Sequence, residues 1–172
     1  MNNTLLALVA AAAMATTGAV AQTLPAGFYM GLGTELVQST AKHANSQAAA
    51  GVNLGMDLNQ HLAAELDLRN AFANGNRKQT QTVMADAKVG VPVNLGFATV
   101  KPYALVGTGY GFSSKSKTNN STTVQPIYNL GAGLVVPVAA HVDVDLRYTH
   151  SATYNTPSRD SDVLGMNVHY RF

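Results

Sequence analysis

Apolar and polar residues alternate along most of this chain. In the segment that ends at Phe172, every second residue from Leu164 onward is apolar, while the residues between them are glycine or polar. Residues 141–148 repeat this pattern, with apolar even positions and polar or charged odd positions. Because neighbouring side chains of a β-strand point to opposite faces of the sheet, each segment predicts a strand with one apolar face.

The same alternation extends back to about residue 26 and predicts eight strands. Residues 52–58 and 62–69 alternate as clearly as the C-terminal segments do. Each predicted strand has about ten residues or more, which is enough to cross a bilayer when the strand is tilted. The expected strands are 26–37, 47–58, 61–72, 81–93, 97–112, 123–137, 140–153 and 162–172. Proline removes a ladder hydrogen bond, and four prolines lie in or beside these strands: Pro92, Pro102, Pro126 and Pro137.

The connections between these strands alternate between short and long. Tight turns are expected at Asn59-Gln60, at Asn94-Leu95-Gly96 and near Ala139, since Asn and Gly favour turn conformations. Longer polar connections are expected at 38–46, 73–80, 113–122 and 154–161. This arrangement is typical of an all-β, eight-stranded, antiparallel up-and-down transmembrane barrel with short periplasmic turns and long outer loops.

Composition bears on which face of the barrel is apolar. A soluble periplasmic barrel that binds a ligand shows the same alternation with its apolar face turned inward. Only 12% of the residues are charged, about half of the roughly 25% that is usual in soluble domains. The positions that alternate with the apolar ones hold mostly Gly, Asn and Ala rather than Lys and Glu. This composition favours a narrow packed interior at these positions, with lipid on the apolar outside. The chain has no cysteine, so thiol catalysis and cysteine metal sites are excluded.

The first 21 residues resemble an export signal. The apolar run from Leu5 to Ala15 is too short to span a bilayer, and Ala19-Val20-Ala21 matches an A-x-A cleavage site. We therefore expect a signal peptide at 1–21, cleaved after Ala21, and a single barrel domain at 22–172. The expected location is the outer membrane of a Gram-negative bacterium.

Most charged residues share the polar parity and are expected to point into the barrel. An eight-stranded barrel is only wide enough to be filled by its own side chains, and an unpaired buried charge costs several kcal/mol. Opposite charges at this density therefore predict an interior network of ion pairs, with a proton or ion path through the barrel as the alternative. The expected network is Glu35, Asp57, Glu65, Asp67, Arg69, Asp86, Lys88, Lys101, Asp143, Asp145, Arg147, His169 and Arg171.

The remaining basic residues fall in the long connections, where only Asp160 and Asp162 oppose them. Basic loop tips would lie close to the phosphates of lipopolysaccharide, so a contact with an anionic lipid or glycan is expected there. An ordinary solvated loop surface is the alternative. The residues are Lys42, Arg77, Lys78, Lys115, Lys117 and Arg159.

Aromatic residues near the strand ends predict two girdles at the membrane interfaces. The girdle near the long connections would contain Phe72, Tyr110, Phe112 and Tyr148, and the one near the tight turns would contain Phe28, Tyr170 and Phe172.

His141, Asp143 and Asp145 place three possible metal ligands on one face of a predicted strand. Arg171 on the next strand should pair with Asp143 or Asp145, and a neighbouring positive charge disfavours a metal. We therefore expect no metal and no cofactor. The alternating glycines at 31–33 and 107–111 lie in no strand-to-helix turn, so they indicate room inside a narrow barrel rather than a phosphate loop.

Several motifs resemble the small outer-membrane barrels of the OmpA-like, OmpX-like and opacity-protein type. The matching residues are Lys101-Pro102-Tyr103-Ala104, Leu146-Arg147-Tyr148 and the closing Val168-His169-Tyr170-Arg171-Phe172. The resemblance covers essentially the whole mature chain and implies that Tyr170 and Phe172 form the signal read by the barrel-insertion machinery. It implies roles in envelope integrity, adhesion or resistance to host defences. The peptidoglycan-binding domain of full-length OmpA-like proteins is not expected.

An enzyme of similar architecture is a further alternative. Lipid A deacylases are also eight-stranded barrels, and they carry a His and a Ser two residues apart on the lipid-facing side of a late strand. His150 has the outward parity and Asp162 could orient it, but position 152 is Ala and Ser151 points to the other face. We therefore expect a non-enzymatic barrel with a structural or surface-interaction role, and keep a narrow passive pore as the alternative.

Overall fold

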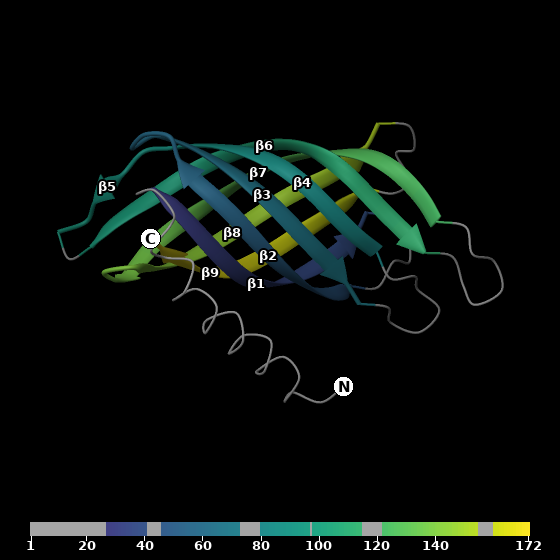
Figure 1. Cartoon of the computed structure of the whole chain (residues 1–172), viewed down its shortest axis with the longest axis horizontal. Coiled ribbons are helices and arrows are strands. Elements are labelled where there is room, and N and C mark those ends of the chain that lie inside the picture. The colour runs from purple at the N-terminus through teal and green to yellow at the C-terminus, as the bar shows by residue number, and fades with distance from the viewer. Residues whose placement is uncertain (1–26, 41–45, 73–79, 97, 115–121, 155–159) are drawn as a thin grey trace, which may run out of the picture.

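The computed structural model describes residues 27–40, 46–72, 80–96, 98–114, 122–154 and 160–172, and eight of the nine strands in these segments close into a barrel (Figure 1). The strands are β1 (Phe28–Ser39), β2 (Gln47–Asp57), β3 (Leu62–Ala71), β4 (Thr80–Gly90), β5 (Val93–Asn94), β6 (Thr99–Ser114), β7 (Thr122–Ala139), β8 (Val142–Thr153) and β9 (Ser161–Arg171). The predicted fold class is confirmed. Within these segments no helix is long and apolar enough to cross a membrane.

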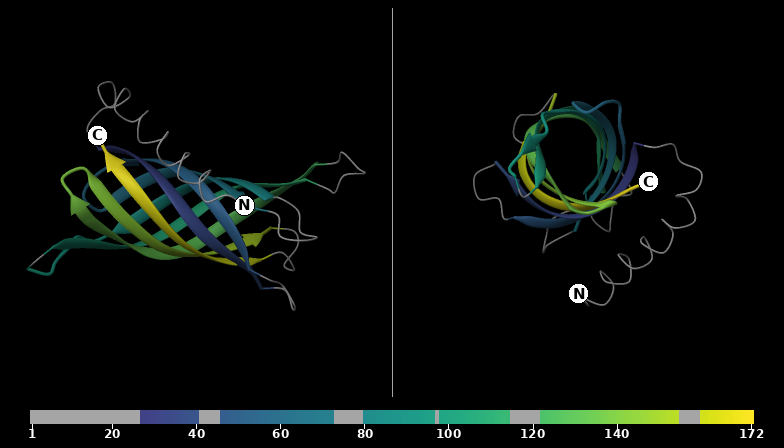
Figure 2. Two further views of the ribbon diagram at one scale, coloured as in Figure 1. Left: turned by 90° about the horizontal axis from the view of Figure 1, so that it is seen from below. Right: turned by 90° about the vertical axis from the view of Figure 1, so that its left-hand side faces the viewer.

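Two pairings close the ring. β1 pairs antiparallel with β9, from Tyr29 opposite Arg171 to Ser39 opposite Ser161. β4 pairs directly with β6, so the two-residue β5 lies outside the ring. The view along the long axis shows the closed circle of strands (Figure 2). Because the ring is closed, it has no open sheet edge. A strand inside a membrane needs such closure, since the hydrocarbon core offers backbone N–H and C=O groups no hydrogen-bond partner.

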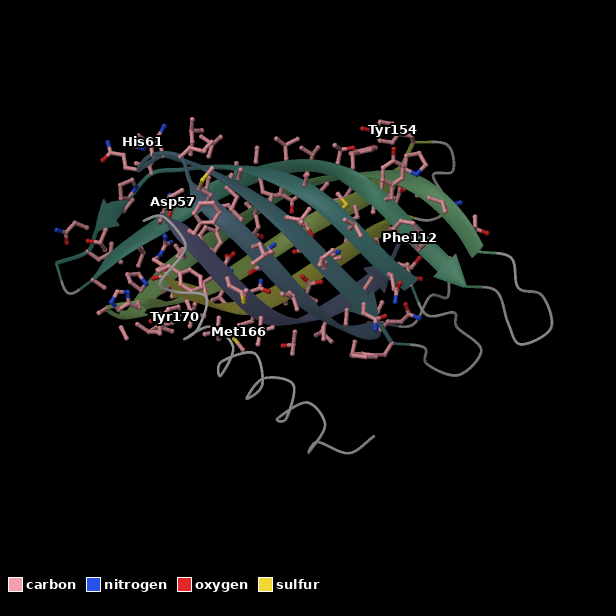
Figure 3. The ribbon with its side chains drawn as sticks, in the orientation of Figure 1. Asp57, His61, Phe112, Tyr154, Met166 and Tyr170 are labelled. Carbon is pink, nitrogen blue, oxygen red and sulfur yellow. The ribbon has the colours of Figure 1, made fainter. Side chains whose placement is uncertain are left out.

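The wall is apolar outside and polar inside. Leu66 is 42% exposed, whereas its neighbours Glu65 and Asp67 are 4% and 3% exposed. The same contrast holds along β9, where Met166 is exposed and points outward (Figure 3) while Asn167 is buried. The predicted orientation, with the apolar parity outward, is therefore confirmed. We call the polar interior the lumen, the end with the tight turns the turn end, and the opposite end the loop end.

The predicted C-terminal boundary of the fourth strand is wrong. β4 ends at Gly90 rather than at residue 93, because Pro92 has no N–H to continue the ladder. The chain then continues as β5, which pairs with residues 99 and 100 of β6 and forms a hairpin that extends beyond the ring (Figure 1). Its turn begins one residue later than predicted, with Gly96 at a φ of 85°. Pro102 and Pro126 lie within regular strands, and Pro137 lies at a register shift between β7 and β8.

Two glycines make room for tyrosines inside the narrow barrel. Tyr29 lies opposite Gly55, and a Cβ added to Gly55 would lie 2.0 Å from the Tyr29 ring. Tyr103 lies opposite Gly133, where an added Cβ would lie 2.4 Å from the ring. A large side chain on one strand thus occupies the space that a glycine leaves on the next. These contacts bring both phenol groups to the middle of the lumen.

Candidate functional site: a charged lumen with a polar outer end

Arg147 is the centre of the charged lumen. It projects from β8 and is 2% exposed. Its Nη2 lies 2.9 Å from Glu65 and 3.2 Å from Asp145, and its Nη1 lies 3.0 Å from Asp67. When the Asn167 amide is oriented with its oxygen toward Arg147, that oxygen accepts hydrogen bonds at 3.0 and 3.1 Å. One guanidinium therefore joins β3, β8 and β9 across the barrel.

Lys88 joins β4 to the same cluster. Its Nζ lies 2.7 Å from Glu65 and 3.0 Å from Asp145, so each of these carboxylates is shared with Arg147. The Tyr29 hydroxyl donates to Glu65 at 2.9 Å, and the Tyr103 hydroxyl donates to Asp145 at 2.6 Å. The sequence pattern of charges revealed neither tyrosine. Both tyrosines lie at inward-facing positions of their strands, and each has a glycine opposite it on the neighbouring strand. This combination is the sequence signal that identifies them.

A second cluster lies at the turn end of the lumen. Arg171 contacts both Asp57 and Asp143, and Lys101 lies 3.4 Å from Asp57. The predicted pairing of Arg171 with Asp143 is therefore present. These side chains are more open to solvent than the central cluster, and the Arg171 side chain is 31% exposed. Figure 3 shows Asp57 near this end, close to the tight turn that carries His61.

Toward the loop end the number of charges falls. Arg69 pairs with Glu35, and both are buried. Asp86 has no cationic partner among the described residues, and it accepts a long hydrogen bond of 3.5 Å from Asn129. Asn129 in turn accepts a hydrogen bond of 2.7 Å from the Ser151 hydroxyl. Among the charged contacts of the predicted network, that of His169 is the longest, with its Nε2 3.9 Å from Asp145 and its ring packed on Tyr29.

The three possible metal ligands at the start of β8, His141 in the preceding turn and Asp143 and Asp145 in the strand, are not brought together. The His141 ring faces the Arg171 carbonyl oxygen at 3.1 Å, Asp143 pairs with Arg171, and Asp145 pairs with Lys88 and Arg147. Two other groups do bring ligand atoms within 4.8 Å of one another: Glu65 with Asp145 and His169, and Glu65 with Asp67 and Asp86. Arg147 and Lys88 already form ion pairs with carboxylates of these groups. The positive charge that a metal ion would bring to these carboxylates is therefore largely supplied by side chains.

His150 lies on the outer wall near the loop end. Its Nδ1 lies 2.9 Å from Asp162, and the Tyr148 hydroxyl donates to the same carboxylate oxygen at 2.8 Å. Ser151, the residue next to His150, donates to Asn129 inside the lumen and is therefore turned away. The structure provides an oriented imidazole, but Ala152 stands on the outer parity where a deacylase would have its serine.

Aromatic residues lie on the wall at both ends. Near the loop end, Tyr110 and Tyr148 are 55% and 49% exposed, and Figure 3 shows Phe112 and Tyr154 there. Tyr154 packs against Tyr128 with a ring-centroid distance of 5.2 Å, and this pair was missed in the sequence. At the turn end, Tyr170 and Phe172 pack edge to face. The six basic residues predicted to bind anions, Lys42, Arg77, Lys78, Lys115, Lys117 and Arg159, lie outside the described residues.

Residues 4–172 match the family model of the outer membrane protein β-barrel domain. The chain belongs to this family. Membership of the outer-membrane barrels means that the exposed leucines face lipid, so the soluble ligand-carrying alternative is wrong. A comparison with curated protein sequences gives no match.

Solved structures share this outer-membrane barrel at low sequence identity. Neisserial surface protein A, NspA, is 17% identical with a TM-score of 0.73, covering 85% of this chain and 97% of that chain. Ail of Yersinia pestis, in complex with the heparin analogue sucrose octasulfate, is 14% identical with a TM-score of 0.54, covering 84% and 96%. The outer membrane enzyme PagL is 13% identical with a TM-score of 0.53, covering 83% and 99%. A surface protein and an enzyme share the fold, so the fold alone does not select the function.

Proposed function

We propose that this outer-membrane barrel acts by contact at the cell surface, with its strands as the anchor and its basic outer connections as a surface for polyanionic lipids or glycans. The distribution of charge carries this proposal. Five of the eleven Lys and Arg residues belong to barrel strands and point into the lumen, and the other six all fall in segments that join strands at the loop end. Seven of the nine acids belong to the lumen. The loop end is therefore basic, although the whole chain has a formal charge of only +2.

The position of these connections follows from the described strands. Successive strands of an up-and-down barrel run in opposite directions, so every second connection leaves at the same end. The segments that follow β1, β3, β6 and β8 therefore share one end of the barrel. Polybasic segments at a membrane surface gain about 1 kcal/mol per Lys or Arg near anionic headgroups. Six such residues make a contact with lipopolysaccharide or an anionic surface glycan favourable.

The filled lumen supports an anchor rather than the alternative of a passive pore. Glu65, Lys88, Asp145 and Arg147 connect opposite sides of the wall with ion pairs of 2.7 to 3.2 Å. An ion that crossed the lumen would have to break several of these buried pairs, each of which costs several kcal/mol to separate. The buried tyrosines Tyr29 and Tyr103 add their rings to this cluster and donate hydrogen bonds to Glu65 and Asp145.

Two of the structural neighbours bear on the choice between surface contact and catalysis. Ail binds a heparin analogue, sucrose octasulfate, which is a polyanion. PagL is an outer membrane enzyme. The His and Ser pattern of the deacylase alternative is incomplete in this chain, because position 152 is Ala. We therefore infer that the chain is non-enzymatic and that Asp162 and Tyr148 fix His150 as part of the headgroup-level surface.

The proposal is tested by removing basic residues from one connection of the folded, full-length barrel. In the double variant Lys115→Gln/Lys117→Gln, we expect the affinity for sucrose octasulfate and for lipopolysaccharide micelles to fall by about fivefold per lysine. The difference should shrink as salt screens the contact. Isothermal titration calorimetry in detergent measures both effects.

The matched control is Asn119→Gln/Asn120→Gln, which changes two residues of the same segment without changing its charge. Its affinity should equal that of the unmodified protein. Equal binding by the lysine variant and its control, or affinity that does not depend on salt, contradicts the proposal.

A further inference from the structure

Above the ion pairs, the loop end of the lumen opens into a cavity of about 300 Å³ with a mixed polar and apolar lining. We call it the outer cup. All eight barrel strands line it, and its walls include Ser39, Gln47, Thr82, Ser113, Ser151 and Ser161. Each of these residues has the inward parity of its strand. Arg69 is the one charged side chain among the described residues of the lining, and Glu35 pairs with it. The outer cup is therefore rich in hydroxyl and amide groups and close to neutral.

From this cavity we propose that the outer cup binds one neutral, polyhydroxylated ring, the size of a single sugar unit. Its volume lies at the lower end of ligand pockets, which measure roughly 300–1,000 Å³. Hydroxyl side chains both donate and accept hydrogen bonds, and the side-chain amide of Gln47 does the same, so the lining matches the mixed donors and acceptors of a sugar. Val37 and Ile127 add apolar contacts for the C–H faces of a sugar ring.

The charge and the position of the outer cup restrict what can enter it. Because Glu35 neutralises Arg69, the cavity has no free guanidinium to favour an anion over a neutral molecule. The ion pairs around Arg147 close the lumen below, so a ligand reaches the cup from the loop end. A larger hollow of about 940 Å³ lies over Ala64, Ala85 and Ala87, whose side chains are exposed on the outer wall rather than in the lumen. The proposal does not depend on the basic connections, since it concerns neutral ligands.

Gly111 provides a variant that blocks the outer cup. A Cβ added to Gly111 would meet no atom closer than 3.9 Å, so the first atom of a side chain fits there, and Gly111 has the inward parity that directs the rest toward the cavity. Gly111→Leu should fill the cup and abolish binding. Thr82→Val removes one lining hydroxyl at nearly constant shape and should weaken binding by about fivefold, the effect of one hydrogen bond. Thr108→Val is the matched control, because Thr108 lies on the outer wall.

The measurement is two-dimensional NMR of the full-length barrel in detergent micelles, titrated with methyl α-D-glucopyranoside, with maltotriose and with sodium sulfate. We expect saturable shifts of the cup amides with the neutral sugars, at a Kd of the order of 1 mM. Binding of the monosaccharide alone indicates a free sugar, whereas equal or tighter binding of maltotriose indicates the end of a glycan. Both outcomes support the cup.

Three outcomes overturn the inference. No saturable shift with either sugar means that the cup holds only water. Shifts that persist in Gly111→Leu place the sugar elsewhere. Shifts with sulfate but not with sugar make Arg69 a simple anion site. Each variant must first show the heat-modifiable gel mobility of a folded barrel, and Thr82→Val keeps the test decisive if Gly111→Leu fails to fold.

Discussion

At the scale of single residues, the stability of the lumen depends on how a few cations are shared. Arg147 serves three carboxylates, and two of them are also bound by Lys88. Such sharing suits a barrel whose lumen holds more acids than bases, because each cation offsets the desolvation of more than one anion. Arg147 is accordingly the residue whose loss leaves the largest uncompensated charge.

We predict that Arg147→Met destabilises the barrel by about 3–5 kcal/mol, the usual loss when one partner of a buried ion pair is removed. Lys101→Met is the matched control, because Lys101 makes a single contact of 3.4 Å at the turn end and its side chain is 20% exposed. Its loss should cost less than about 1 kcal/mol. Urea unfolding of both variants in micelles measures the difference, and equal losses would argue against a central role for Arg147.

At the scale of elements, the strands follow from alternation and the interruptions follow from proline. Seven predicted strands end within a few residues of the observed boundaries, and the clear exception is the segment around Pro92. There the apolar residues Val89, Val91 and Val93 continue the alternation, and all three are exposed. However, the pairing of β4 with β6 ends at Gly90. Alternation alone could not reveal the end of β4. The residues of β5 alternate in the same way, although β5 has a neighbouring strand on one side only.

The hairpin around β5 should therefore be dispensable for folding. β5 pairs only with β6, and only two residue pairs join them. Replacing residues 93–100 by Asn-Gly should leave the barrel closed, since Asn-Gly favours a two-residue hairpin turn, and should change stability by less than about 1 kcal/mol. Gel mobility of boiled and unboiled samples measures closure. A variant that no longer shows a folded band would mean that the hairpin helps to close β4 against β6.

At the scale of the whole molecule, the barrel separates its charges by region. The middle of the lumen holds linked ion pairs, and the outer cup is lined by hydroxyl and amide groups together with the paired Arg69. The basic residues outside the lumen all belong to the loop-end connections. The lipid-facing wall is mostly apolar, and the polar group of Tyr148, His150 and Asp162 lies near its rim. This arrangement fits an anchored surface protein better than a channel.

We expect the purified full-length barrel to show no single-channel conductance in planar bilayers at neutral pH. The physical reason is that the cluster around Arg147 spans the lumen with direct ion pairs. A known porin in the same bilayers provides the positive control. Reproducible current steps that scale with salt concentration would show a water path past these pairs and would favour the passive pore.

From the sequence alone, the eight strands of the ring and their inward and outward parities could be predicted, and the parities in turn predicted which charges point into the lumen. These features depend on the two-residue period of a strand, which can be read locally. Which charges pair, which tyrosines join them and where the outer cup lies became known only from the folded barrel. Arg147 and Asp67 are 80 residues apart, and their contact depends on the register of every strand between them and on the closure of β1 against β9. No local pattern carries that information, because register and closure are properties of the whole ring.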